Sequence, residues 1–199
     1  LLGEFVFPAG KVTQIRFMLD AAESGGTVPA NPGSYVKRVG DNTEYPLFVP
    51  SGSSSGFKVT GAFDVPVNDE VTVTVDFDVR KSVTFRNDAY KLQPTLRAVP
   101  DGEAGKIAGS VTNAGGNTAV IFAYEDGDYS ASELNVTADT PVFHNAVTSA
   151  VAVASSYVLP FLAAGTYDLA IALFDANGSY ISGSVSIVED VAVTSGGTT

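Results

Sequence analysis

The chain of 199 residues has no cysteine and no tryptophan, and it holds one histidine and one methionine. The missing cysteines exclude disulfides, thiolate catalysis and cysteine-ligated metals. No apolar run approaches the roughly eighteen residues of a membrane-spanning helix, so we expect no span. Acidic residues outnumber basic ones by 22 to 11, which leaves a net charge of −11. This balance argues against nucleic acids and anionic membranes as partners, because both are bound through Lys and Arg.

Glycine, serine, threonine and valine are abundant instead. Hydrophobic residues reach 45%, whereas charged residues make up 17%, below the usual quarter. This composition predicts an all-β protein. A secreted chain of this size that manages without disulfides points to a bacterial or archaeal surface, so we expect an extracellular, cell-surface location.

Period-two alternation is the main structural signal. It is clearest at 70–79, where apolar residues alternate with Thr72, Thr74, Asp76 and Asp78. Further strands are predicted at 3–7, 11–20, 44–49, 57–63, 91–99, 106–113, 119–124, 156–162, 165–175 and 180–187. The segment 21–42 is expected to be a long loop or a weak hairpin around 35–39. Asn177-Gly178 predicts a tight hairpin turn. The segment 141–153 is compatible with a strand or a short helix.

The turn-rich segment PDGEAG at 100–105 divides the chain. We predict two tandem antiparallel β-sandwich domains, at 1–101 and 102–199. The pattern of Ala-Gly followed by an alternating strand that ends in Asp occurs at 9–20 and again at 164–175. Shared turn chemistry and duplication both explain this echo.

Candidate catalytic and metal-binding residues are few. His144 lies in an apolar segment and no Gly-x-Ser-x-Gly motif accompanies it, so we expect a structural histidine. Glu125, Asp126 and Asp128 crowd a turn and are a weak candidate for Ca²⁺, although their spacing does not match an EF-hand loop.

Asp76 and Asp78 lie on one strand face, and nothing nominates a third carboxylate across a cleft, as a glycosidase would need. We expect both to face solvent. The absence of tryptophan argues against a Trp-lined sugar platform, although tyrosine could substitute for it. We therefore predict no enzyme activity, no catalytic residue, no cofactor and no required metal.

Several motifs in the first half resemble, in order, a family of bacterial secreted lipoproteins that is known only as a domain of unknown function. They are PAGKVTQIR at 8–16, YPLFVPSG at 45–52, DFD at 76–78, KSV at 81–83 and YKLQPTLR at 90–97. The resemblance implies a surface protein with a lipid anchor in its precursor. It implies no catalytic residue.

The second half is similar to carboxypeptidase-regulatory or transthyretin-like sandwiches. The motifs are GKIAGSV at 105–111, AVIFAY at 119–124 and LAAGTY at 162–167. This resemblance implies a transthyretin- or Ig-like sandwich, again without a catalytic residue.

The start of the chain looks like the middle of a domain. Residues 3–7 enter an apolar strand without a polar lead-in, and the opening strands usual in the lipoprotein family are missing. We expect Leu1 to be a processed or truncated end. A sandwich that lacks strands exposes unpaired backbone and an apolar groove. We predict this acceptor groove at Phe5, Phe7, Ile15, Phe17 and Leu19.

The expected function follows from such a groove. A strand donated by a neighbouring copy would complete the sheet, and repetition of that contact would build a head-to-tail polymer. We therefore predict a structural subunit of an extracellular filament or pilus whose partners are copies of itself. The alternatives are a monomeric cell-surface lipoprotein that binds glycan or protein, and an accessory β-module of a secreted enzyme.

The C-terminal segment is the predicted donor strand. Val185, Ile187, Val191 and Val193 share one parity there, interrupted by Glu189. Gly196 and Gly197 would leave a loose end. The rival hypothesis is that this segment folds back onto its own domain.

Overall fold

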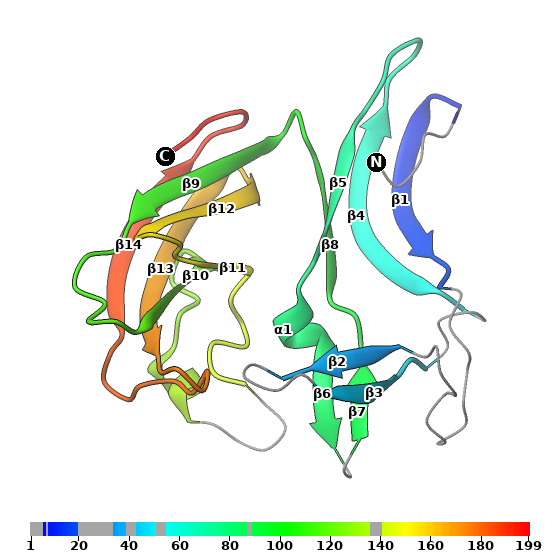
Figure 1. Cartoon of the computed structure of the whole chain (residues 1–199). Coiled ribbons are helices and arrows are strands. Elements are labelled where there is room, and N and C mark those ends of the chain that lie inside the picture. The colour runs from blue at the N-terminus through cyan, green and yellow to red at the C-terminus, as the bar shows by residue number, and fades with distance from the viewer. Residues whose placement is uncertain are drawn as a thin grey trace.

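The structure is a computed structural model that describes residues 6, 8–19, 34–38, 43–50, 55–86, 89–135 and 141–199. Of these residues, 54% lie in strands and 5% in helices, which confirms the predicted all-β class. The strands form two groups, one on either side of the turn at 101–103 (Figure 1). Within the described residues, no helix is long and apolar enough to cross a membrane.

The described residues of the first half form eight strands and one helical turn. These are β1 (Gly10–Phe17), β2 (Tyr35–Lys37), β3 (Glu44–Phe48), β4 (Phe57–Val65), β5 (Val73–Phe77), α1 (Val79–Ser82), β6 (Val83–Arg86), β7 (Ala89–Leu92) and β8 (Leu96–Pro100). The strand predicted at 3–7 falls almost entirely outside the described residues, and Val6 is not in a strand.

Three small sheets make up the described part of this half. β1 pairs with β4, β5 pairs with β8, and the third sheet has the order β2-β3-β7-β6. β3 and β7 run parallel, so the pairing differs from the all-antiparallel arrangement that we expected. The core of the four-stranded sheet consists of Leu47, Val49 and Leu92, and Leu19 and Phe57 pack against it.

β5 is shorter than the strand predicted at 70–79. It ends at Phe77 because Asp78 caps α1, where its carboxylate accepts a hydrogen bond from the Lys81 backbone N–H at 3.3 Å. Val79 therefore lies in the helical turn and is 58% exposed, instead of continuing the inward face of the strand.

Ser82 ties this turn to the chain before β8. It is fully buried, and its Oγ accepts a hydrogen bond from the Thr95 N–H at 2.8 Å. Its carbonyl oxygen accepts another from the Gln93 N–H at 2.7 Å. Gln93, Pro94 and Thr95 break the strand predicted at 91–99 into β7 and β8, because proline cannot donate to a ladder.

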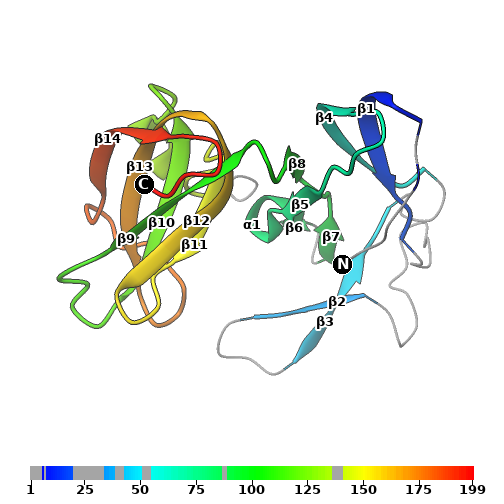
Figure 2. The same ribbon diagram turned by 90° about the horizontal axis from the view of Figure 1, so that it is seen from above.

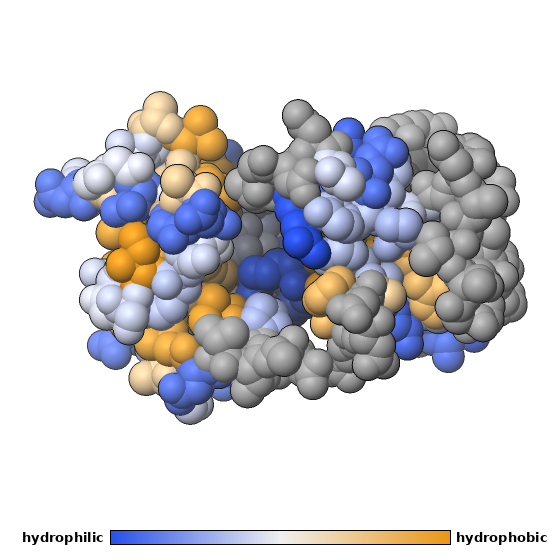
Figure 3. Space-filling model, turned by 60° about the horizontal axis from the view of Figure 1, so that its bottom comes forward, coloured by the Kyte–Doolittle hydropathy of each residue, from blue (hydrophilic) through white to orange (hydrophobic). Residues whose placement is uncertain are grey.

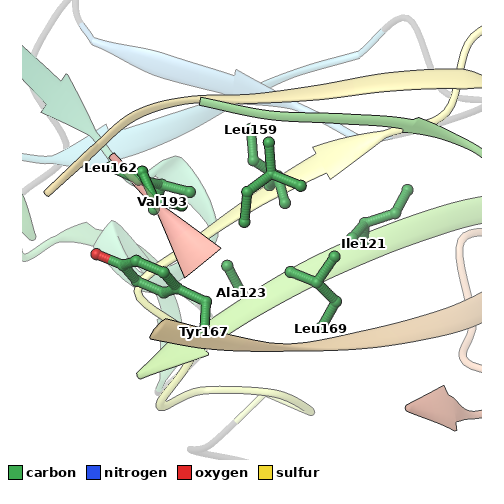
Figure 4. Packing of buried hydrophobic residues seen from close by; sticks show 8 residues of the cluster. Ile121, Ala123, Leu159, Leu162, Tyr167, Leu169 and Val193 are labelled. Carbon is green, nitrogen blue, oxygen red and sulfur yellow. The ribbon is translucent and has the colours of Figure 1, made fainter. Parts of the chain in front are cut away.

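Six strands are present in the part of the second half that the structure describes. They are β9 (Ala104–Ser110), β10 (Thr118–Glu125), β11 (Thr148–Val151), β12 (Ser156–Ala163), β13 (Gly165–Phe174) and β14 (Ser186–Val193), with a 3₁₀ turn at Ala131–Leu134. One sheet has the order β11-β10-β13-β14, and β12 with β9 forms the other. Apolar side chains from both sheets fill the space between them (Figure 4). They are Ile107, Ile121, Ala123, Leu159, Leu162, Tyr167, Leu169 and Val193.

β10 and β13 are buried on both faces. Opposite the core between the sheets, Phe122, Ala170 and Ala172 belong to a second apolar cluster that Phe143 and Ala146 complete from the loop before β11. The rings of Phe122 and Phe143 stack with their centres 4.2 Å apart. This double burial explains why both strands read as continuous apolar runs rather than as a clean alternation.

The turn predicted at Asn177-Gly178 is present. Gly178 has φ of 80°, and the Asp175 carboxylate accepts hydrogen bonds from the N–H groups of Asn177 and Ser179. The return strand predicted at 180–187 is not formed, because Tyr180 and Val185 pack across the second apolar cluster instead. β14 starts at 186.

Candidate strand-acceptor groove

An apolar groove of about 250 Å³ lies between the β1–β4 sheet and the β5–β8 sheet. Among the described residues that line it, no side chain is charged or carries a hydrogen-bonding group. These residues are Phe17, Leu19, Phe57, Val75, Phe77, Leu92, Pro94 and Leu96. Phe77 remains 42% exposed at this groove. This described lining is suited to apolar side chains.

Unpaired strand edges border the groove. In the described residues no third strand joins β1 with β4, or β5 with β8. Among the described residues, each of these four strands is hydrogen-bonded to another strand along one edge only, and β4 and β8 also lie against each other. A strand edge without a hydrogen-bonded strand offers N–H and C=O groups in the spacing that an added strand needs.

Two of the predicted acceptor residues, Phe17 and Leu19, line this groove. Ile15 is half-buried on the same face of β1 but does not reach the lining, and Phe5 and Phe7 lie outside the described residues. Sequence reasoning missed the opposite wall, formed by β5 and by the chain around Pro94. The alternation at 70–79 was the signal that could have found it, since Val75 and Phe77 belong to that apolar face.

The predicted donor segment lies within its own half of the chain. β14 pairs antiparallel with β13, and Val193 is 4% exposed in the core. The residues after β14 are not loose, because Thr199 donates to the Lys106 carbonyl at 2.9 Å and accepts from the Ala108 N–H at 2.7 Å. The fold-back arrangement is therefore the one present in this structure.

A β-bulge in β14 breaks the predicted parity. Tyr167 faces Val191 and Leu169 faces Val188, so two residues of β14 lie opposite Asp168. One of them, Asp190, has φ of 60° and donates its N–H to the Asp168 carboxylate at 3.2 Å. The prediction that all four apolar residues share a face is thus wrong. Val191 and Val193 join the core between the sheets, whereas Val185 and Ile187 belong to the other side.

The acidic turn after β10 does not assemble a metal site. Asp126 and Asp128 are exposed, and their backbone N–H groups donate to the carbonyls of Thr166 and Glu125. In the part of the chain that the structure describes, no group of three or more His, Cys, Asp or Glu is placed to hold a metal ion.

Asp76 and Asp78 do not face solvent freely, contrary to our expectation. Asp76 pairs with Arg97 at 2.9 Å, and Asp78 pairs with Arg80 at 3.3 Å. The Asp78 side chain is 12% exposed. Burial lowers the pKa of Arg80, and the Asp78 carboxylate partly offsets that shift. Each aspartate thereby orients an arginine.

Both arginines reach into the second half. Arg80 donates to the carbonyls of Val142 and Phe143, and its guanidinium lies 5.0 Å from the centre of the Phe122 ring. Arg97 donates to the Phe161 carbonyl at 2.7 Å. Hydrophilic residues gather where the two halves face each other (Figure 3). The DFDVR segment at 76–80 thus links the two halves, directly through Arg80 and through the pairing of Asp76 with Arg97. We call this segment the DFDVR clamp.

A buried carboxylate that the sequence did not single out lies in the 3₁₀ turn. Glu133 is 4% exposed and accepts hydrogen bonds from the Tyr124 hydroxyl at 3.1 Å and from the Asn145 N–H at 3.0 Å. Burial, and then the Glu133 charge, raises the pKa of Tyr124. His144 Nδ1 lies 3.8 Å from Glu133 and has no hydrogen-bond partner among the described residues. Glu133 thereby joins the 3₁₀ turn to β10 and to the chain before β11.

Residues 1–94 match the family described as Domain of unknown function (DUF4382). The match covers both walls of the groove except Leu96, and it includes the DFDVR clamp. No curated protein and no solved structure matches the chain.

Proposed function

We propose that this chain is a structural subunit of an extracellular filament, in which the groove of one copy receives a β-segment from the next. The observation that supports the proposal is a groove whose described lining carries no polar side chain, next to strand edges that have no hydrogen-bonded strand among the described residues. An inserted segment gains ladder hydrogen bonds, and each aliphatic side chain that it buries adds about 1.5–3 kcal/mol before entropy is subtracted. Because acceptor and donor are different surfaces, the contact repeats head to tail, and it builds an open filament when the rotation between copies does not close a ring.

The location belongs to the same proposal. The cysteine-free, lysine-poor composition and the lipoprotein-like motifs in 8–97 support a bacterial cell-surface protein with a lipid anchor in its precursor. The packing of β9 and β12 on the larger sheet supports a transthyretin-like second domain, which would act as a spacer along the filament.

The test introduces a charge into the groove. Phe77→Glu places a carboxylate in a site without polar partners, and Phe77 is exposed enough for the fold to survive. Val79→Glu, two residues away and 58% exposed outside the groove, is the matched control. Light scattering after size-exclusion chromatography, with negative-stain microscopy, should show polymers for wild type and Val79→Glu and folded monomers for Phe77→Glu. A wild type that stays monomeric at high concentration contradicts the proposal.

One cluster favours the alternative of a glycan-binding surface protein. The Arg38 guanidinium lies 4.4 Å from the Tyr45 ring centre and 5.6 Å from that of Tyr90, whose hydroxyl accepts from Arg38 Nε at 2.6 Å. Phe85 packs on Tyr90 and stays 46% exposed. An exposed ring and two half-buried tyrosine rings beside a fixed cation suit a sugar with a carboxylate. Titration with polygalacturonate should show saturable binding that Tyr45→Ala abolishes; no binding excludes this alternative.

A further inference from the structure

The β11–β12 hairpin carries its apolar side chains in an unusual order. On and just after β11 the small residues Ala150 and Ala152 pack against the core, while Val151 and Val153 point outward. Val151 is 53% exposed and Val153 is 73% exposed, and Val158 on β12 adds a side chain that is 49% exposed. Packing within the chain does not explain larger residues outside and smaller ones inside. We call these three valines the valine tip.

The turn of this hairpin holds the valine tip in a fixed shape. Val153 and Ser156 exchange two backbone hydrogen bonds, at 2.9 and 3.0 Å. Between them, Ala154 and Ser155 have φ of 48° and 68°, which is the geometry of a two-residue hairpin turn although neither is glycine. A rigid apolar tip has little conformational entropy to lose when it binds.

The valine tip matches the groove in charge. Residues 145–167 contain no Asp, Glu, Lys or Arg, although the chain carries a net charge of −11. The described lining of the groove likewise carries no charged or polar side chain. Most contacts between two copies of so acidic a chain would bring like charges together, and these two surfaces avoid that repulsion. The predicted donor at 185–193 would instead carry Glu189 and Asp190 to the groove.

We propose that the valine tip of one copy inserts into the groove of a second copy. This inference rests on the proposed filament function and names its donor. β11 and β12 lie in the opposite half of the molecule from β1 and β4 (Figure 2), so the partner is another chain rather than the same one. β11 is also an end strand of its sheet, so it can contact a neighbour without leaving β10. A C-terminal donor would first have to leave β13 and the core.

The test compares charged variants at matched exposure. Val151→Glu combined with Val153→Glu should weaken self-association at least about 100-fold, because two carboxylates would enter a groove that has no partner for them. Val188→Glu, on β14 and 45% exposed, is the control and should polymerise like wild type. Sedimentation velocity gives the assembly state, and circular dichroism confirms that each variant is folded.

Complementation makes the result specific. The valine-tip double variant keeps its groove and Phe77→Glu keeps its valine tip, so an equal mixture should form discrete heterodimers that neither forms alone. If the double variant still polymerises while Phe77→Glu does not, the donor assignment is overturned and the filament function stands. If wild type itself is monomeric, both are overturned.

Discussion

The Arg80→Ala substitution tests how firmly the clamp joins the two halves. Arg80 lies on α1, pairs with Asp78, donates to the carbonyls of Val142 and Phe143, and covers the Phe122 ring. Its side chain is 21% exposed, so these contacts are largely shielded from water. Truncation to alanine leaves the carboxylate and both carbonyl groups without their cationic partner.

The expected loss follows from these contacts. A hydrogen bond to a charged group contributes about 1.5–3 kcal/mol, and a cation–π contact adds about 0.5–1 kcal/mol. The bond to Val142 is long at 3.4 Å and adds little. We therefore expect Arg80→Ala to lower the free energy of unfolding by about 3–5 kcal/mol, the range for breaking a mostly buried pair. Arg80→Lys keeps the charge but not the planar fork, and should lose roughly half as much.

Urea unfolding provides the assay. Circular dichroism in the far ultraviolet follows the strands, and the near ultraviolet follows the tyrosine environments. In Arg80→Ala the two signals should separate, because the first half loses its support from the second and unfolds at lower urea. A loss below about 1 kcal/mol, with the two signals still coincident, would show that the clamp does not join the halves and would refute the reasoning.

Two further predictions concern buried polar groups of the second half. Asp168 is 7% exposed and accepts hydrogen bonds from the N–H groups of Gly127 and Asp190. Asp168→Ala should therefore lower the free energy of unfolding, measured with urea, by about 2–4 kcal/mol. An unchanged free energy of unfolding would show that this carboxylate does not hold the bulge. The raised pKa of Tyr124 means that the folded protein keeps this proton at a pH where the unfolded chain, with a value near 10.0, has lost it. The stability that the Tyr124 hydroxyl contributes is thus fully present below about pH 10 and is lost above it. From about pH 9 to 11, the urea midpoint of Tyr124→Phe should fall less steeply than that of wild type. An identical fall in both proteins would contradict a raised pKa for Tyr124.

Local sequence patterns predicted the positions of several strands well. β4, β13 and the turn at Asn177 lie where alternation and turn chemistry placed them. An aspartate before a polar run is a helix-start signal, so Asp78 indicates a helix cap. The valine alternation at 70–79 predicts a strand through the same residue. The two signals predict different structures at Asp78, and the structure forms the cap.

Other features depend on contacts between distant residues. Nothing local marks Asp190 as a bulge; its position follows from Asp168, which binds it from the neighbouring strand. Arg80 of the clamp, and Arg97 that pairs with it through Asp76, donate to backbone carbonyls of the second half. Backbone carbonyls have no sequence signature. For the same reason the sequence predicts only the β1 wall of the groove. The position of β5 opposite β1 depends on contacts between distant residues, which no local pattern indicates.

The most direct test of the central claim uses the absence of cysteine from the chain. Phe77→Cys in one copy and Val153→Cys in another place single thiols on the groove and on the valine tip. Under mild oxidation, an equal mixture should yield disulfide-linked dimers on a non-reducing gel, because inserted side chains come within the Cβ separation of about 3.5–4.5 Å that a disulfide needs. Phe77→Cys mixed with Val188→Cys should yield few. Equal cross-linking in both mixtures, or none in the first, would contradict insertion of the valine tip into the groove.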